Sequence, residues 1–277
     1  MKPIQTTTLL LTLLLPINYA LADTETDIIN WLDVASLKAT FDSATKSNVA
    51  LSNITPIKLT NGEDAYLASA SIKDEIPTPI GYVLARPAAT KAVVLARYMP
   101  TEGNSSDIVN LGNSDKGSVL MIRSGGGGTG SYNKQVSIVK FDNWNVSVLH
   151  SSDSGVSEMG DCDNEPKPNP DMCDRHDTFL NKLGSADANQ VLFAETKVQY
   201  DFKTKKPKVT ATKILSFPIG ASSENAANSG QTQSETFLNK IEYSKPTSEN
   251  PDAPEKNPLS VETKVEQGKV VSTKIIP

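Results

Sequence analysis

The residues best suited to catalysis gather around His150, one of only two histidines in the 277-residue chain. Asp153 and Ser154 follow it closely, so the three residue types of a nucleophilic triad lie together in sequence. In such a triad the histidine takes the serine proton and a carboxylate orients the histidine. Adjacent residues rarely supply a whole triad, so His150, Asp153 and Ser154 are candidates only under an enzymatic hypothesis. The second histidine, His176, is expected to cap or decorate a helix that begins beside it.

A run of four glycines, Gly125, Gly126, Gly127 and Gly128, follows a strand predicted at 118–122. Consecutive glycines let backbone N–H groups face an anion, as in phosphate cradles and oxyanion holes. The run is not a P-loop, because the Gly-Lys-Ser/Thr ending is missing, and it lacks the helix and acidic residue of a dinucleotide fingerprint. Two interpretations of the glycine run remain, an anion-binding loop and a flexible turn between strands, and the flexible turn is favoured.

The segment 116–158 resembles the early part of an α/β-hydrolase, with a strand, a Gly-rich loop, a short helix and a second strand. The preceding Gly81–Pro87 is similar to the strand that enters that fold. The resemblance implies an oxyanion loop at Gly125–Gly128 and a helix over Tyr132–Phe141. Arg123-Ser124 replaces the usual histidine, and no Gly-x-Ser-x-Gly nucleophile elbow exists in the chain. The resemblance therefore implies a hydrolase scaffold. The alternative function is hydrolysis of an ester or related bond, either retained or lost in a degenerate enzyme.

The only two cysteines, Cys162 and Cys173, are close in sequence. In an oxidising compartment such a pair normally forms a disulfide, and closing so short a loop stabilises the fold by about 2–3 kcal/mol. The companion ligands and the spacing of a zinc site are missing. Carboxylates crowd the segment 161–176, but without the pattern of an EF-hand loop, so a solvated acidic loop is favoured over a calcium site. The sequence predicts a structural disulfide, no metal site and no cofactor.

Residues 1–22 have the pattern of a secretory signal peptide. Lys2 precedes an apolar stretch from Leu9 to Leu15, and a small-x-small end follows at Ala20-Leu21-Ala22. Cleavage near Ala22 predicts an exported protein, either periplasmic or secreted. No other apolar run approaches the roughly 20 residues that span a bilayer, so no transmembrane span is predicted.

Hydrophobic periodicity predicts one amphipathic helix over Asp27–Ala44. Beyond it, short runs enriched in Val and Ile are bounded by Pro, Gly, Asn and Ser, which is typical of strands. The predicted strands are 66–72, 80–86, 92–99, 118–123, 136–141 and 144–149, of which 136–141 could also form a short helix.

The clearest signal is an internal repeat of three blocks in the same order. The offsets between the copies are 58, 67 and 61 residues, so the loops differ while the elements persist. The matching blocks are 177–183 with 235–241, 195–198 with 262–265, and 208–214 with 269–275. Each copy is interpreted as a short helix followed by a hairpin. The two copies are expected either to pack on each other or to extend one sheet.

These observations predict a β-rich α+β protein. An N-terminal helix and a mixed sheet occupy 23–160, the disulfide-clipped acidic loop 161–176, and the duplicated helix–hairpin region 177–277, with copies at 177–217 and 235–277. Without its signal the chain has 26 Lys+Arg against 32 Asp+Glu, so nucleic acid is not expected as a partner. The preferred hypothesis is an exported, non-catalytic binding protein with a protein or polysaccharide partner. An exported α/β-hydrolase-like enzyme is the alternative.

Overall fold

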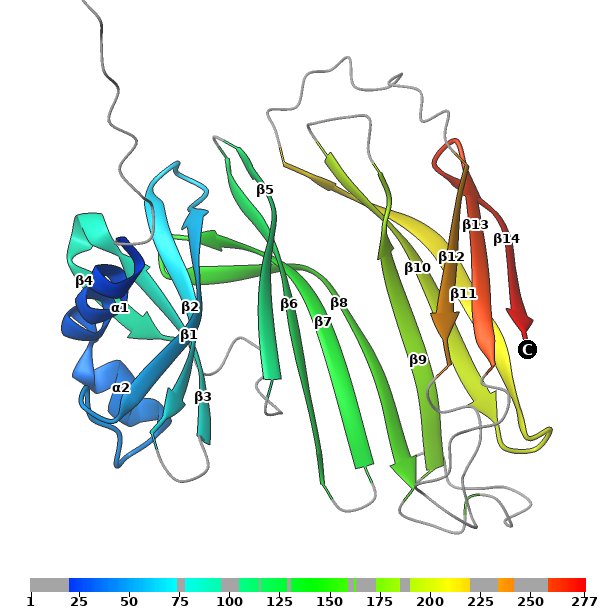
Figure 1. Cartoon of the computed structure of the whole chain (residues 1–277), viewed down its shortest axis with the longest axis horizontal. Coiled ribbons are helices and arrows are strands. Elements are labelled where there is room, and N and C mark those ends of the chain that lie inside the picture. The colour runs from blue at the N-terminus through cyan, green and yellow to red at the C-terminus, as the bar shows by residue number, and fades with distance from the viewer. Residues whose placement is uncertain are drawn as a thin grey trace, which may run out of the picture.

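The computed structural model describes residues 20–73, 78–95, 105–114, 116–128, 131–158, 162, 173–184, 190–219, 234–241 and 259–277. In these residues the chain forms two α-helices at the N-terminus and fourteen strands (Figure 1). The strands make three sheets, and every pairing between them is antiparallel. The predicted α+β class with a mixed sheet is therefore wrong, because the described part of the chain is almost entirely antiparallel β-structure.

The first layer consists of α1 (Ala20–Trp31) and α2 (Val34–Thr40), where the sequence predicted a single helix. The break falls at Asp33, whose carboxylate accepts a hydrogen bond from Ala35 N at 2.9 Å and so caps α2. The cleavage site predicted near Ala22 lies in the first turn of α1, and the rest of the predicted signal lies outside the described residues.

The second layer is a four-stranded sheet of β1 (Val49–Lys58), β2 (Asp64–Ile72), β3 (Thr78–Arg86) and β4 (Lys91–Val94), in that order. One face of this sheet buries Ile28 and Leu37 of the two helices, together with Val83 and Ala92. The other face is also apolar, and Figure 1 shows it turned toward the next sheet.

The central sheet has seven strands in sequence order. They are β5 (Ser105–Ser114), β6 (Gly117–Gly128), β7 (Ser131–Asp142), β8 (Asn145–Glu158), β9 (Cys173–Lys182), β10 (Gln190–Asp201) and β11 (Lys206–Pro218). The helix that the hydrolase resemblance implied over Tyr132–Phe141 is instead strand β7. The predicted strands in this region are confirmed, although the sequence analysis missed β1 and β5.

Strand β7 shows why the central sheet packs on two sides. Val139 and Phe141 lie on one face and join the cluster formed by Leu67 and Leu84 of the four-stranded sheet. Ile138 points to the opposite face, where Phe193 of β10 and Phe217 of β11 cover it. Because side chains alternate along a strand, this end of β7 is apolar on both faces and needs a layer on each.

The central sheet curls, so that β9–β11 lie against the face of β5–β8 opposite the four-stranded sheet. Leu111, Met121 and Ile138 of the first half pack against Phe193 and Phe217 of the second. Gly112 of β5 allows a close approach at one end, since a Cβ there would lie 2.6 Å from Ile219 Cδ1. The hydrogen-bonded connection between the halves is short, with four pairs from Gly155↔His176 to Glu158↔Cys173.

The third sheet contains β12 (Ser234–Lys240), β13 (Ser260–Glu266) and β14 (Lys269–Ile276), in that order. The sequence repeat therefore corresponds to two three-stranded meanders, β9–β11 and β12–β14. The predicted hairpins are confirmed as β10–β11 and β13–β14, whereas the predicted helices are wrong, because these segments are strands β9 and β12. The adjacent apolar residues Phe179 and Leu180 mimic helical spacing because layers cover both faces of β9. Two-sided burial removes the alternation that marks a strand.

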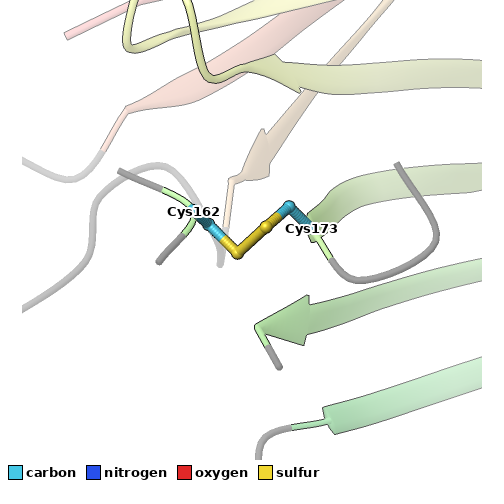
Figure 2. Close-up of a disulfide and its surroundings, with 2 residues drawn as sticks. All are labelled: Cys162 and Cys173. Atoms are coloured by element: carbon cyan, nitrogen blue, oxygen red, sulfur yellow. A yellow bond between two sulfur atoms is a disulfide. The ribbon is translucent and has the colours of Figure 1, made fainter. Parts of the chain in front are cut away.

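The predicted disulfide is confirmed. Cys162 and Cys173 are joined, with their Cα atoms 5.4 Å apart, and Cys173 is the first residue of β9 (Figure 2). The bond closes a loop of sequence separation 11 next to the short β8–β9 connection. None of the helices in the described residues has the length and apolar character needed to cross a bilayer.

Replacing both cysteines, Cys162→Ser with Cys173→Ser, should lower the free energy of unfolding by about 2–3 kcal/mol, because the unfolded chain regains the freedom of the closed loop. Urea unfolding followed by circular dichroism measures this loss. Reductant should destabilise the wild-type protein to the same extent and leave the double variant unchanged. Equal midpoints for the variant and the oxidised wild type would contradict the prediction.

Candidate functional site

The structure does not bring the three candidate triad residues together. The ring of His150 meets Glu195, with Nε2 2.7 Å from Oε1. Asp153 instead contacts His176, 3.2 Å from its Nε2. Alternation along β8 places Asp153 on the face opposite His150 and Ser154. Each residue therefore has a separate setting.

Ser154 holds together two strands that are separating. Its hydroxyl accepts a hydrogen bond from Thr178 N at 2.7 Å and lies 3.3 Å from Thr178 O, to which it donates. The backbone ladder between β8 and β9 ends at Gly155, so the serine side chain makes the next link in its place. Both bonds engage the oxygen that a nucleophile would use.

The four glycines are part of a strand. Gly125 pairs with Lys134, and Gly128 pairs with Ser131 across the β6–β7 ladder. A run of N–H groups along a strand alternates in direction and so does not converge on one anion. The predicted oxyanion loop thus corresponds to the last part of β6.

A buried carboxylate links the two halves of the central sheet. Glu195 on β10 is 1% exposed and lies between His150 of β8 and Lys213 of β11, whose Nζ is 3.0 Å from Oε2. The equivalent residue in the second meander is Glu262, which pairs with Lys274 at 3.2 Å but is 19% exposed. Glu195 bridges the strands where β8 and β9 no longer pair, and the contacts assign it a structural role.

The repeat supplies a matched control for this role. Glu195→Ala should lower the free energy of unfolding by about 1–3 kcal/mol, because His150 loses its partner in a buried setting. Glu262→Ala should lower it by less than about 1 kcal/mol, since Glu262 is only half-buried and its partner Lys274 is exposed. Urea titrations of the two variants measure the difference, and equal losses would refute the structural role of Glu195.

One face of β7–β10 is polar over the half that extends away from the four-stranded sheet. In Figure 1, β7 and β8 approach that sheet near their connecting turn and diverge from it toward their other ends. We define the polar face by ten of the residues that the register places on this side, and all except Gly155 are exposed or half-buried. The polar face comprises Ser131, Asn133, Gln135, Ser151, Asp153, Gly155, Ser157, Asp174, His176 and Gln199.

His176 is the centre of the polar face, in β9 and not at a helix start as the sequence predicted. Its Nδ1 is 2.6 Å from Asp174 Oδ2, and its Nε2 is 3.2 Å from Asp153 Oδ2. Gln199 donates to the second oxygen of Asp174 at 2.7 Å. The ring lies against Gly155, where a Cβ would be 3.5 Å from His176 Cε1 and 3.0 Å from Tyr132 O. The close approach that glycine permits here is therefore to the backbone of β7, while the imidazole lies at ordinary contact distance.

The two carboxylates set the charge of this histidine. The hydrogen bond to Asp174, with a smaller contribution from Asp153, raises the pKa of His176 above its ordinary value of 6.5, although partial burial opposes the shift. The same bond lowers the pKa of Asp174. The two carboxylates therefore favour the protonated form of His176, an imidazolium that lies between them. In the described part of the chain, no group of three or more His, Cys, Asp and Glu side chains could hold a metal ion.

A raised pKa in the folded protein means that His176 stabilises the fold when protonated and loses this contribution as pH rises through its folded-state pKa. The stability difference between wild type and His176→Gln should therefore be largest near about pH 5.5 and shrink above neutrality. Urea unfolding across this range, with Asp42→Asn as an exposed control, measures the difference. A gap that widens with pH would contradict the assignment.

Comparisons with protein-family models, with curated proteins and with solved structures give no match to this chain. The sequence analysis missed the polar face because its members come from four strands. One signal was present in β7, where Ser131, Asn133 and Gln135 alternate with Tyr132 and Lys134 before the apolar positions begin.

Proposed function

We propose that this is an exported, non-catalytic binding protein that uses the polar face to bind a neutral polysaccharide. The observation that carries the proposal is the polar, solvent-accessible half of a sheet whose other half is buried on the same side. On β7 this side changes from Ser131, Asn133 and Gln135 to the buried Val139 and Phe141. Within the described residues, the sheet is covered where it is apolar and open where it can form hydrogen bonds.

The chemistry of the polar face favours a carbohydrate over a protein. Hydroxyl, amide and carboxylate groups supply both donors and acceptors for sugar hydroxyls. The cores of protein interfaces are enriched in aromatic residues, Met and Arg, and the polar face has none of these. Asp153 and Asp174 flank His176 on the polar face, so an anionic polymer is disfavoured beside this histidine.

Export rests on two observations. The first 22 residues have the signal pattern, and the Cys162–Cys173 disulfide is of the kind that persists in oxidising compartments. An extracytoplasmic polysaccharide is accessible to such a protein. The absence of an assembled triad around His150 favours binding over hydrolysis.

Native gel electrophoresis in the presence of dextran, laminarin, mannan or alginate tests the proposal. A neutral polysaccharide should retard the wild-type protein, whereas alginate should not. Asn133→Ala should weaken the retardation about tenfold, equivalent to the loss of about 1.4 kcal/mol. Asn145→Ala makes the same change at an exposed position outside the polar face and should bind as wild type.

Two results would refute the proposal. The first is a folded wild-type protein that no neutral polysaccharide retards, either in the gels or on a glycan array. The second is equal weakening by Asn133→Ala and Asn145→Ala, because binding would then not depend on the polar face.

A further inference from the structure

The two meanders of the repeat meet through equivalent residues. Thr196 of β10 and Thr263 of β13 occupy the same repeat position, 67 residues apart, and both are completely buried. Their Oγ1 atoms lie 2.9 Å apart in a hydrogen bond. A residue that contacts its own counterpart marks a local two-fold axis between the copies.

The hydrophobic contacts on either side of this axis follow the same symmetry. One cluster contains Leu183, Leu192, Ala194 and Ile214 of the first meander with Phe237, Val265 and Val270 of the second. The other contains Ile241, Leu259, Val261 and Ile275 of the second with Phe179, Val198 and Val209 of the first. Replacing each residue by its repeat counterpart converts one cluster into the other, member by member.

The backbones of the two meanders also match. Glu195 pairs with Leu180 and with Lys213, and Glu262 pairs with Leu238 and with Lys274. A register shift follows Lys197 in the first copy and Lys264 in the second. The bulge restores the same alternation in β11 and β14, so both copies present the same residue positions to the interface.

The interface is apolar at its ends and polar at its centre. Beside the threonine pair, the side-chain nitrogens of Asn181 and Asn239 are buried without a hydrogen-bond partner in the described structure. The same holds for the hydroxyls of Thr212 and Thr273, which are again counterparts. Unsatisfied buried groups cost free energy, so the polar centre weakens the interface between the two meanders. Its polar groups also fix how the two meanders align on each other.

No strand of one meander pairs with a strand of the other in the described residues, where they belong to separate sheets. Side-chain packing holds β12–β14 in place, together with bonds from Gly184 N to the Glu235 carboxylate at 3.2 and 3.3 Å. The sequence between the meanders, 219–233, is fifteen residues long. Displacing β12–β14 as a unit therefore breaks no β-ladder.

We infer that the face of β9–β11 accepts the β12–β14 meander of a second copy of this chain, so that two chains exchange these meanders and form a closed dimer. Every contact within the interface is reproduced, with the two chains supplying opposite sides. The exchanged dimer therefore differs in free energy from two monomers mainly by the entropic cost of associating two chains. A higher protein concentration offsets this cost. The inference is independent of the polar face and of its ligand.

Single cysteine substitutions at the two threonines show whether β12–β14 packs on β9–β11 of its own chain or of a second chain. The wild-type chain has no free thiol, since both of its cysteines are in the disulfide. Full-length Thr196→Cys and Thr263→Cys chains are mixed, brought briefly to the urea midpoint, returned to buffer and oxidised. Exchange predicts a covalent dimer on a non-reducing denaturing gel, in a fraction that rises several-fold with protein concentration.

Two controls calibrate this experiment. The double variant Thr196→Cys/Thr263→Cys at low concentration should lose its free thiols as a monomer, which shows that the two positions can be bridged. A mixture of Ser43→Cys, at an exposed turn, with Thr263→Cys gives the level of random collision.

The outcomes separate cleanly. Covalent dimer in the first mixture, well above the Ser43 control, supports exchange. Dimer at or below that control, when the double variant closes internally, overturns the inference. Dimer formed as readily by Thr196→Cys alone also overturns it, because two β9–β11 faces would then be pairing directly.

Discussion

Both faces of the central sheet carry apolar side chains, and the whole architecture follows from the need to cover them. Val139 and Ile138 are neighbours on β7, and each needs a different layer. The chain supplies these layers in sequence order: helices, four-stranded sheet, β5–β8, β9–β11 and β12–β14 (Figure 1). Since each layer packs on the one next to it in sequence, the apolar surface of one segment is covered by its neighbours along the chain.

The same arrangement explains why residues that resemble a catalytic set serve structural roles. Where the central sheet curls, β8 and β9 separate beyond four paired residues and leave polar groups to be satisfied. Ser154 takes over one backbone link, and Glu195 joins His150 to Lys213 across the gap. Serine, histidine and carboxylate thus gather at a bend in the sheet for the hydrogen bonds that the bend requires.

Much of the β-structure was predictable, because β2, β3 and β6 each contain a short stretch rich in apolar residues that is bounded by turn residues. The disulfide and the repeat were equally clear. Strand β1 was missed because Asn53, with a φ of 53°, and Pro56 interrupt its pattern. The polar face could not be predicted as a site, since His176 and Asp153 become neighbours only through a register between two strands. One-sided alternation in a sequence identifies a strand, but it does not give the register that brings particular side chains of two strands together.

The symmetry of the two meanders has a consequence for substitutions at equivalent positions. Two copies that face each other through equivalent residues have the geometry of a homodimer whose subunits are joined in one chain. In a single chain that contains both copies, each residue has a counterpart that can be substituted independently of it. On the shared face the counterparts stay alike, as at Thr196 and Thr263, because each is the other's environment. On the outer faces they differ: Phe193 packs against β5–β7, whereas its counterpart in the second copy is Ser260.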